Sequence, residues 1–115
     1  MSDESELNIF RALDFIRDNA KPLAVAKGQR IHLEEFRKSK KALLMKEAET
    51  SGQKTAALQE RDAYAHPEYQ ELLLALQAAT EEETRLTWLM KAAEARISAW
   101  QTIEATRRTE RKAIP

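Results

Sequence analysis

The chain has 115 residues, a formal net charge of zero, 33% charged residues, two glycines and no cysteine. This length fits one domain, the scarcity of glycine favours helices because turns between strands use glycine, and the lack of cysteine excludes disulfides and thiolate metal sites. No apolar run approaches the roughly 18 residues needed to cross a bilayer, and no signal-peptide core follows the acidic start, so we expect a cytoplasmic protein with no membrane partner.

The first predicted helix covers residues 6–19, and the second covers residues 22–49. Pro22 separates them, because the residue before a proline avoids the helical region and proline suits the first position of a helix. Ser5 is placed to cap the first helix. Its apolar stripe is Leu7, Phe10, Leu13 and Ile16. The apolar face of the second helix is Leu23, Ala26, Ile31, Leu33, Phe36, Leu43, Leu44 and Ala48.

A polar connection over residues 50–54 leads to a short predicted helix over 55–65, and Pro67 then starts a long helix over 67–112. At 1.5 Å per residue the long helix extends ~65–70 Å. Steps of three and four along it select a seam, and nine of its ten positions are apolar: Tyr69, Leu72, Leu76, Ala79, Glu83, Leu86, Met90, Ala93, Ile97 and Trp100. This spacing is typical of a helix that packs along another helix.

These elements predict one all-α domain, an elongated and coiled-coil-like helical hairpin. The 22–49 helix lies antiparallel on the first two-thirds of the long helix, and the two shorter helices close the ends. Ile97, Trp100 and Ile103 then extend beyond obvious cover from the same chain.

A second stripe, Trp88, Ala92, Ala95 and Ala99, lies on another face of the long helix. Two apolar faces on one helix favour a bundle of several chains, a dimer or a tetramer. Glu83 is the one polar seam residue, and such residues can specify partner or oligomeric state. The predicted interface consists of Leu86, Trp88, Met90, Ala93, Ile97, Trp100 and Ile103.

Two basic clusters are candidates for binding nucleic acid. The first is Arg37, Lys38, Lys40 and Lys41, and the second is Arg107, Arg108, Arg111 and Lys112. Long basic side chains contact phosphates without reading sequence. The alternative is a solvated surface for the first cluster and a complement to the negative helix end for the second.

Signals for catalysis are weak. His32 and Glu35 lie one helical turn apart, a spacing used in metal sites of helical bundles, but they supply too few ligands. The chain has no glycine-rich phosphate loop and no nucleophile elbow. Trp88 and Trp100 could stack on bases, but at helical spacing such residues more often pack or anchor interfaces. We therefore expect a protein that is not an enzyme and has no metal and no cofactor.

Three stretches carry a resemblance to known proteins: RIHLEEFRKSKKALLMKEAE, TAALQERDAYAHPEYQELLLAL and RLTWLMKAAEARISAWQT. Together they resemble small helical proteins of unknown function that bacteriophages and prophages encode near replication and recombination genes. The resemblance implies an accessory role in DNA transactions, in a bacterial or phage-infected cell. It carries over no catalytic residue.

The sequence therefore predicts an all-helical accessory protein that self-associates and docks on a partner protein, or on DNA, in recombination or replication. Two alternatives stay open. One is direct nucleic-acid binding through the basic clusters, and the other is inhibition of a host enzyme by a phage protein.

Overall fold

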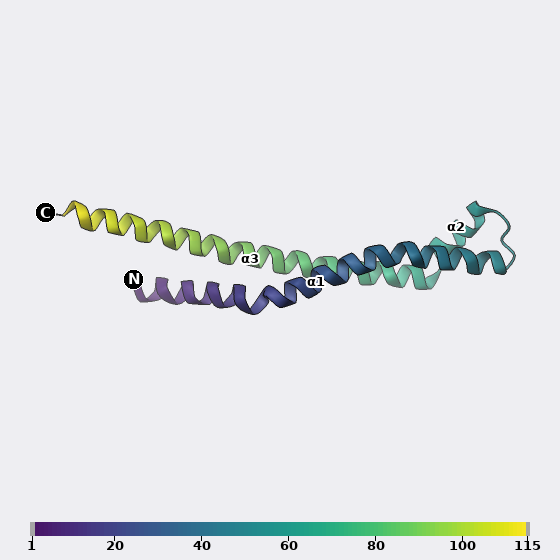
Figure 1. The fold of residues 1–115 in the computed structure, drawn as a ribbon, viewed down its shortest axis with the longest axis horizontal. Helices are drawn as coiled ribbons and strands as arrows, with labels where there is room; N and C mark the ends of the chain where they lie inside the picture. Colours follow the sequence, from purple (N-terminus) through teal and green to yellow (C-terminus); the bar gives the residue numbers. More distant parts are fainter. Residues whose placement is uncertain (1, 115) are drawn as a thin grey trace. The chain divides into compact units, whose positions relative to one another are not determined.

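Three helices make up the part of the chain that the structure describes (Figure 1). This computed structural model describes the backbone of residues 2–114 and the side chains of residues 8–114. Helix α1 spans Ser2–Thr50, α2 spans Ala56–Ala65 and α3 spans Pro67–Ala113. The all-α prediction is confirmed, and the predicted bounds of the last two helices lie within one residue of the observed ones.

The predicted break between residues 19 and 22 is wrong, because α1 continues through Pro22. A proline inside a helix lacks the N–H that would bond to the carbonyl four residues earlier, and costs about 3 kcal/mol. Pro22 is exposed, whereas Asn19, Leu23 and Ala26 on either side of it are buried or half-buried. Tertiary packing on both sides of the proline therefore outweighs its local effect.

Helix α1 ends in a hydrogen-bonded motif that requires a glycine. Gly52 has a φ of 111°, in the left-handed region that favours glycine. The Gln53 N–H donates to the Ala48 carbonyl at 3.0 Å, and the Gly52 N–H donates to the Glu49 carbonyl at 3.1 Å. This pair of bonds is a Schellman motif, and it reverses the chain after α1.

Side-chain caps begin the next two helices. The Leu58 N–H donates to the Thr55 hydroxyl at 3.2 Å, which caps α2. His66 separates α2 from α3, and the Glu68 N–H donates to its Nδ1 at 3.1 Å. Pro67 occupies the first position of α3, where a backbone N–H would have no helical partner.

Contacts divide the chain into two compact units. Unit 1 consists of Met1–Leu23 and Thr84–Pro115, and unit 2 consists of Ala24–Glu83. Within each unit, a segment of α1 and a segment of α3 run in opposite directions (Figure 1). That the two units act as the single domain we expected stays a prediction.

Unit 2 holds the apolar cluster of the hairpin turn. Leu44, Ala63 and Tyr69 are buried together, one from each helix, and Met45 and Leu73 pack against them. The ring of Tyr64 meets that of Tyr69 edge-on, with ring centroids 5.3 Å apart. Helix α2 thus closes the core between α1 and α3.

Unit 1 is a simpler pair of helical segments. Its buried residues are Ile9 and Ala12 from α1 and Leu86 and Ala93 from α3. The predicted stripe through Phe10 and Leu13 is wrong, because these side chains are 62% and 47% exposed. The packed stripe passes one residue earlier, and the side chains of Ser5 and Leu7 lie outside the described residues.

The predicted apolar face of residues 22–49 is also partly wrong. Ile31, Phe36 and Leu43 are exposed. The packed positions of α1 step by three and four through polar residues as well: Ile9, Ala12, Ile16, Asn19, Leu23, Ala26, Arg30, Leu33, Arg37, Lys40, Leu44 and Ala48. Cations occupy seam positions here because α3 supplies acidic partners for Arg30 and Lys40, namely Glu83 and Glu68.

Candidate interaction surface

The predicted seam of α3 is the face that packs on the same chain. All ten of its residues are buried or half-buried, from Tyr69 to Trp100. Most other α3 residues in this stretch are exposed. The heptad pattern therefore reports packing within the chain.

Of the seven predicted interface residues, five belong to this seam. Leu86 and Ala93 are 2% and 4% exposed, and Met90, Ile97 and Trp100 are half-buried. The expectation that Ile97 and Trp100 extend beyond cover from their own chain is wrong. The α1 segment of unit 1 reaches Trp100, since Ile9 and Trp100 line the same groove. The other two predicted interface residues, Trp88 and Ile103, are 65% and 47% exposed.

Trp88 is the largest exposed side chain of unit 1. Lys91 Nζ lies 4.6 Å from the centre of a Trp88 ring, a cation–π contact that covers one face of the indole. Ala92, Ala95 and Ala99 continue the same side of α3 and are exposed. These four residues define the Trp88 face. They lie outside the seam that α1 covers, and Ala92 and Ala99 also line grooves between α1 and α3.

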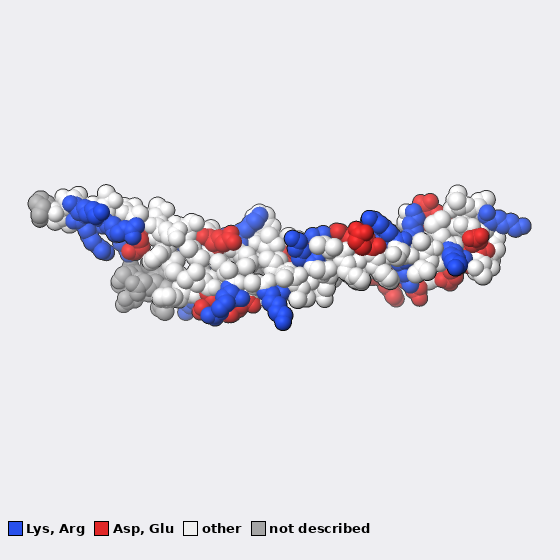
Figure 2. Space-filling model, viewed as in Figure 1, with Lys and Arg blue, Asp and Glu red and all other residues white. Residues whose placement is uncertain are grey.

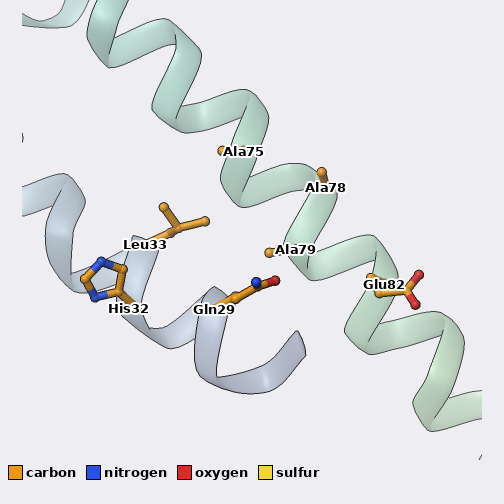
Figure 3. Close-up of a pocket in the computed structure, with 7 residues that line it drawn as sticks. All are labelled: Gln29, His32, Leu33, Ala75, Ala78, Ala79 and Glu82. Atoms are coloured by element: carbon orange, nitrogen blue, oxygen red, sulfur yellow. The ribbon is translucent and has the colours of Figure 1, made fainter. Parts of the chain in front are cut away.

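A groove runs between α1 and α3 in unit 2 (Figure 3). It has a volume of about 480 Å³. Leu33 extends from α1 towards α3, where Ala75, Ala78 and Ala79 leave room because their side chains are short (Figure 3). Gln29, His32 and Glu82 form its polar edge.

A second groove of unit 2, of about 380 Å³, shares Leu33 with the first and lies nearer the hairpin turn. Phe36, which is 40% exposed, lines it together with Leu72. Lys40 and Glu68 also line it, and they pair with each other at 2.7 Å. Glu71 is the remaining charged group on this edge and is exposed.

Two grooves lie between α1 and α3 in unit 1, with volumes of about 220 and 520 Å³. Phe15 and Leu89 line the first, and Ile103 lines the second. Arg11 and Arg96 line both grooves, and both are exposed. Unit 1 therefore presents an apolar groove with a basic edge.

Trp100 adds an unsatisfied donor to unit 1. Its Nε1 is buried and has no hydrogen-bond partner among the described residues. A buried donor without a partner costs free energy of about 1–3 kcal/mol.

The structure draws most of the first basic cluster into contacts within the chain. Lys40 pairs with Glu68, and its side chain is 22% exposed. Lys41 pairs with Glu60 at 3.3 Å and lies 4.7 Å above the ring of Tyr64.

The other two cations of that cluster differ from each other. Lys38 lies 3.4 Å from Glu35 on the surface of α1. Arg37 is half-buried at a seam position. The cluster therefore presents less free positive charge than its sequence suggests.

The second basic cluster remains on the surface. Figure 2 shows Lys and Arg side chains gathered at the C-terminal end of α3. Arg107 pairs with Glu104 at 2.9 Å. Arg108, Arg111 and Lys112 are exposed. These three residues therefore form an exposed basic cluster near the C-terminal end of α3.

His32 lies against an aromatic ring instead of a ligand set. It stacks on Phe36, with ring centroids 5.9 Å apart and an angle of 11° between the rings. Among the described residues, no group of three or more histidine or acidic side chains is arranged to hold a metal ion.

Comparisons with known protein families, with curated proteins and with solved structures found no match. The resemblance to phage and prophage proteins stays an expectation for this reason. Within the described residues, no helix combines the length and the apolar character needed to cross a membrane.

Sequence reasoning missed the grooves and the register of α1. Arg11, Arg96 and Glu71 each border the seam on one side, close to packed positions. The three- and four-residue spacing of seam positions could have identified these neighbouring residues. Using it would have required knowing which residues of α1 pack on α3. Polar residues at Asn19, Arg30, Arg37 and Lys40 hid that register.

Proposed function

We propose that this chain is a non-enzymatic helical interaction protein that self-associates into a bundle of several chains and docks on a partner protein. The exposed Trp88 face carries the proposal, because the side chain of a large aromatic residue is 65% exposed beside a row of alanines. Tryptophan is enriched among the residues that contribute most to binding at protein interfaces. Alanines next to it let the backbone of a partner approach closely.

The same proposal gives the protein an accessory role in DNA recombination or replication. That part rests on the resemblance of its sequence to phage and prophage proteins. Exposed apolar side chains in both units support an interaction role in general, because a complex would remove them from water.

Self-association is tested by sedimentation equilibrium of the full chain over a wide range of concentrations. We expect the mass to rise above the 13.2 kDa of one chain as concentration increases. A single species of that mass at every concentration would remove self-association from the proposal.

Partner docking is tested with a matched pair of variants. Trp88 and Leu74 are both exposed on α3, at 65% and 66%, and they lie in different units. We expect Trp88→Ala to weaken binding to the partner protein about 30-fold or more, the range of a residue that dominates an interface. Leu74→Ala should retain the partner in the same co-purification experiment. Equal retention by the two variants would contradict a role for the Trp88 face.

The second candidate function is direct binding to nucleic acid, and the C-terminal basic cluster favours it. Arg108, Arg111 and Lys112 are exposed, whereas Lys40 and Lys41 of the first cluster are paired within the chain. Replacing the three C-terminal residues by alanine should weaken binding to a DNA duplex. The log–log slope of affinity against salt should also become shallower, by about 0.9 for each phosphate that the protein ceases to neutralise. The matched control replaces Lys38, Lys40 and Lys41, and a larger decrease in affinity for this control would contradict the assignment.

A further inference from the structure

The grooves of the two units differ in the charge at their edges. In unit 1, Arg11 and Arg96 line both grooves, and the other lining residues are apolar or uncharged. In unit 2, Lys40 and Glu68 neutralise each other, and Glu71 remains on the edge of the groove that they line. One groove system is therefore basic at its edge and the other is acidic.

The apolar parts of the two groove systems are also suited to each other. Phe36 stands on the edge of the unit 2 groove and is 40% exposed. Leu89 and Ile103 stand on the edges of the unit 1 grooves and are 40% and 47% exposed. Alanines form much of the floor, with Ala75 and Ala78 in unit 2 (Figure 3). Large side chains beside small ones allow ridges of one helix pair to enter the grooves of another.

We infer that a second copy of this chain occupies these grooves in a head-to-tail arrangement, with unit 1 of one copy against unit 2 of the other. Arg11 and Arg96 of one copy then meet Glu71 of its partner. This inference rests on the proposed self-association and names its surface and its register.

The charges favour this arrangement over a head-to-head one. If unit 1 met unit 1, Arg11 and Arg96 would face their own copies across a partly desolvated interface, where like charges repel strongly. If unit 2 met unit 2, Glu71 would face its own copy. Head-to-tail pairing replaces both repulsions by attractions.

Charge reversal tests this pairing in the full-length protein. The first variant carries Arg11→Glu and Arg96→Glu, and the second carries Glu71→Arg. All three side chains are exposed, so these changes leave the buried seam intact. Helix content measured by circular dichroism verifies that each variant is folded.

We expect each variant alone to dimerise about tenfold more weakly than the unmodified chain, because reversal places like charges across the interface. An equimolar mixture of the two variants should recover association as a heterodimer, since every edge contact is again between opposite charges. Lys21→Glu and Glu49→Arg are the matched controls, because both residues are exposed and neither lines these grooves. The controls should dimerise like the unmodified chain.

Each other result would overturn the inference in a recognisable way. If the unmodified chain associates and the reversals have no effect, the second copy binds elsewhere, and the proposed interaction function stands. If each variant is weakened and the mixture does not recover, the head-to-tail register is wrong. If the unmodified chain is monomeric at all concentrations, the inference and the proposed self-association fall together.

Discussion

The two units share one helical pattern and differ in what holds it together. Unit 2 joins three helices around Leu44, Ala63 and Tyr69, and ion pairs cross between its helices. In unit 1, two helical segments pack through Ile9, Ala12, Leu86 and Ala93, and the ion pairs of Arg17 and Arg107 stay within one helix. Two segments that share one heptad seam can therefore differ in stability.

The two units also differ in net charge. Unit 1 contains ten basic and eight acidic residues, a net charge of +2, and unit 2 contains nine basic and eleven acidic residues, a net charge of −2. The total charge of zero conceals this difference. The two units therefore carry opposite net charges.

Leu44→Ala should cause the largest change in stability of the substitutions considered, and it tests the core of unit 2. Leu44 is 3% exposed in the apolar cluster, so the change leaves a cavity and lowers the free energy of unfolding by about 2–5 kcal/mol. Urea unfolding monitored by circular dichroism measures the decrease. Leu43→Ala is the matched control, because Leu43 is 59% exposed and should change stability by less than about 0.5 kcal/mol. Equal effects of the two changes would show that the cluster is not a core.

Pro22→Ala should stabilise the chain by an amount of about 1–3 kcal/mol. Alanine restores an N–H that can donate to the carbonyl of residue 18, and it removes the crowding by the proline ring. Pro22 lies one residue before the end of unit 1's α1 segment, so the gain should appear as slower amide hydrogen exchange in residues 8–23. Unchanged exchange there would mean that packing of unit 1 already compensates fully for the proline.

Gly28→Ala should give a smaller gain of about 1 kcal/mol. A Cβ added at Gly28 meets no atom within 4 Å, so alanine improves helix propensity without a clash. The absence of a neighbour also shows that Gly28 makes no close helix crossing. Gly52→Ala is the opposite control, because its φ of 111° strains any residue with a side chain. Thermal unfolding should move up for the first change and down for the second.

The bounds of α2 and α3 were readable from the sequence, whereas the continuity of α1 through Pro22 and the packed face of α1 were not. Thr55 and Pro67 mark helix starts by local chemistry, and the α3 seam is almost entirely apolar, so both could be predicted. In α1 the seam passes through Arg30, Arg37 and Lys40, while Phe36 and Leu43 are exposed. Hydrophobicity alone cannot find such a seam, because Arg30 and Lys40 pair there with acidic residues more than twenty residues away.

The candidate surface was predictable only in part for the same reason. Trp88 stood out because its stripe lies on a different face from the apolar seam that the sequence shows. The grooves depend on which residues of α1 pack against α3. The sequence did not show this register, because Pro22 predicted a break in α1 and cations occupy several seam positions. Long-range pairing of this kind leaves no local signal.

Acidification should lower the stability of unit 2 through Glu83, and we expect this effect to be the smallest of those considered. Its hydrogen bonds from Arg30, one of them 3.3 Å long, hold the pKa of the Glu83 carboxyl below its ordinary value, and the charge of Lys27 adds to this. A lowered folded pKa means that the ionised carboxylate stabilises the fold above the ordinary glutamate pKa of about 4.3. This stability disappears as the pH falls below that value, because the unfolded chain takes up the proton first.

The measurement is the urea midpoint of the unmodified chain and of Glu83→Gln between neutral pH and about pH 3. At neutral pH the variant should unfold at lower urea, because its amide cannot replace the charged partner of Arg30. The two midpoints should converge on acidification, since the unmodified carboxyl then becomes neutral as well. Glu49→Gln, at an exposed glutamate near the end of α1, should follow the unmodified chain throughout. Parallel curves for the unmodified chain and Glu83→Gln would mean that the Arg30 pair does not stabilise unit 2. The packing of Leu44, Ala63 and Tyr69 would then be left as the main difference between the units.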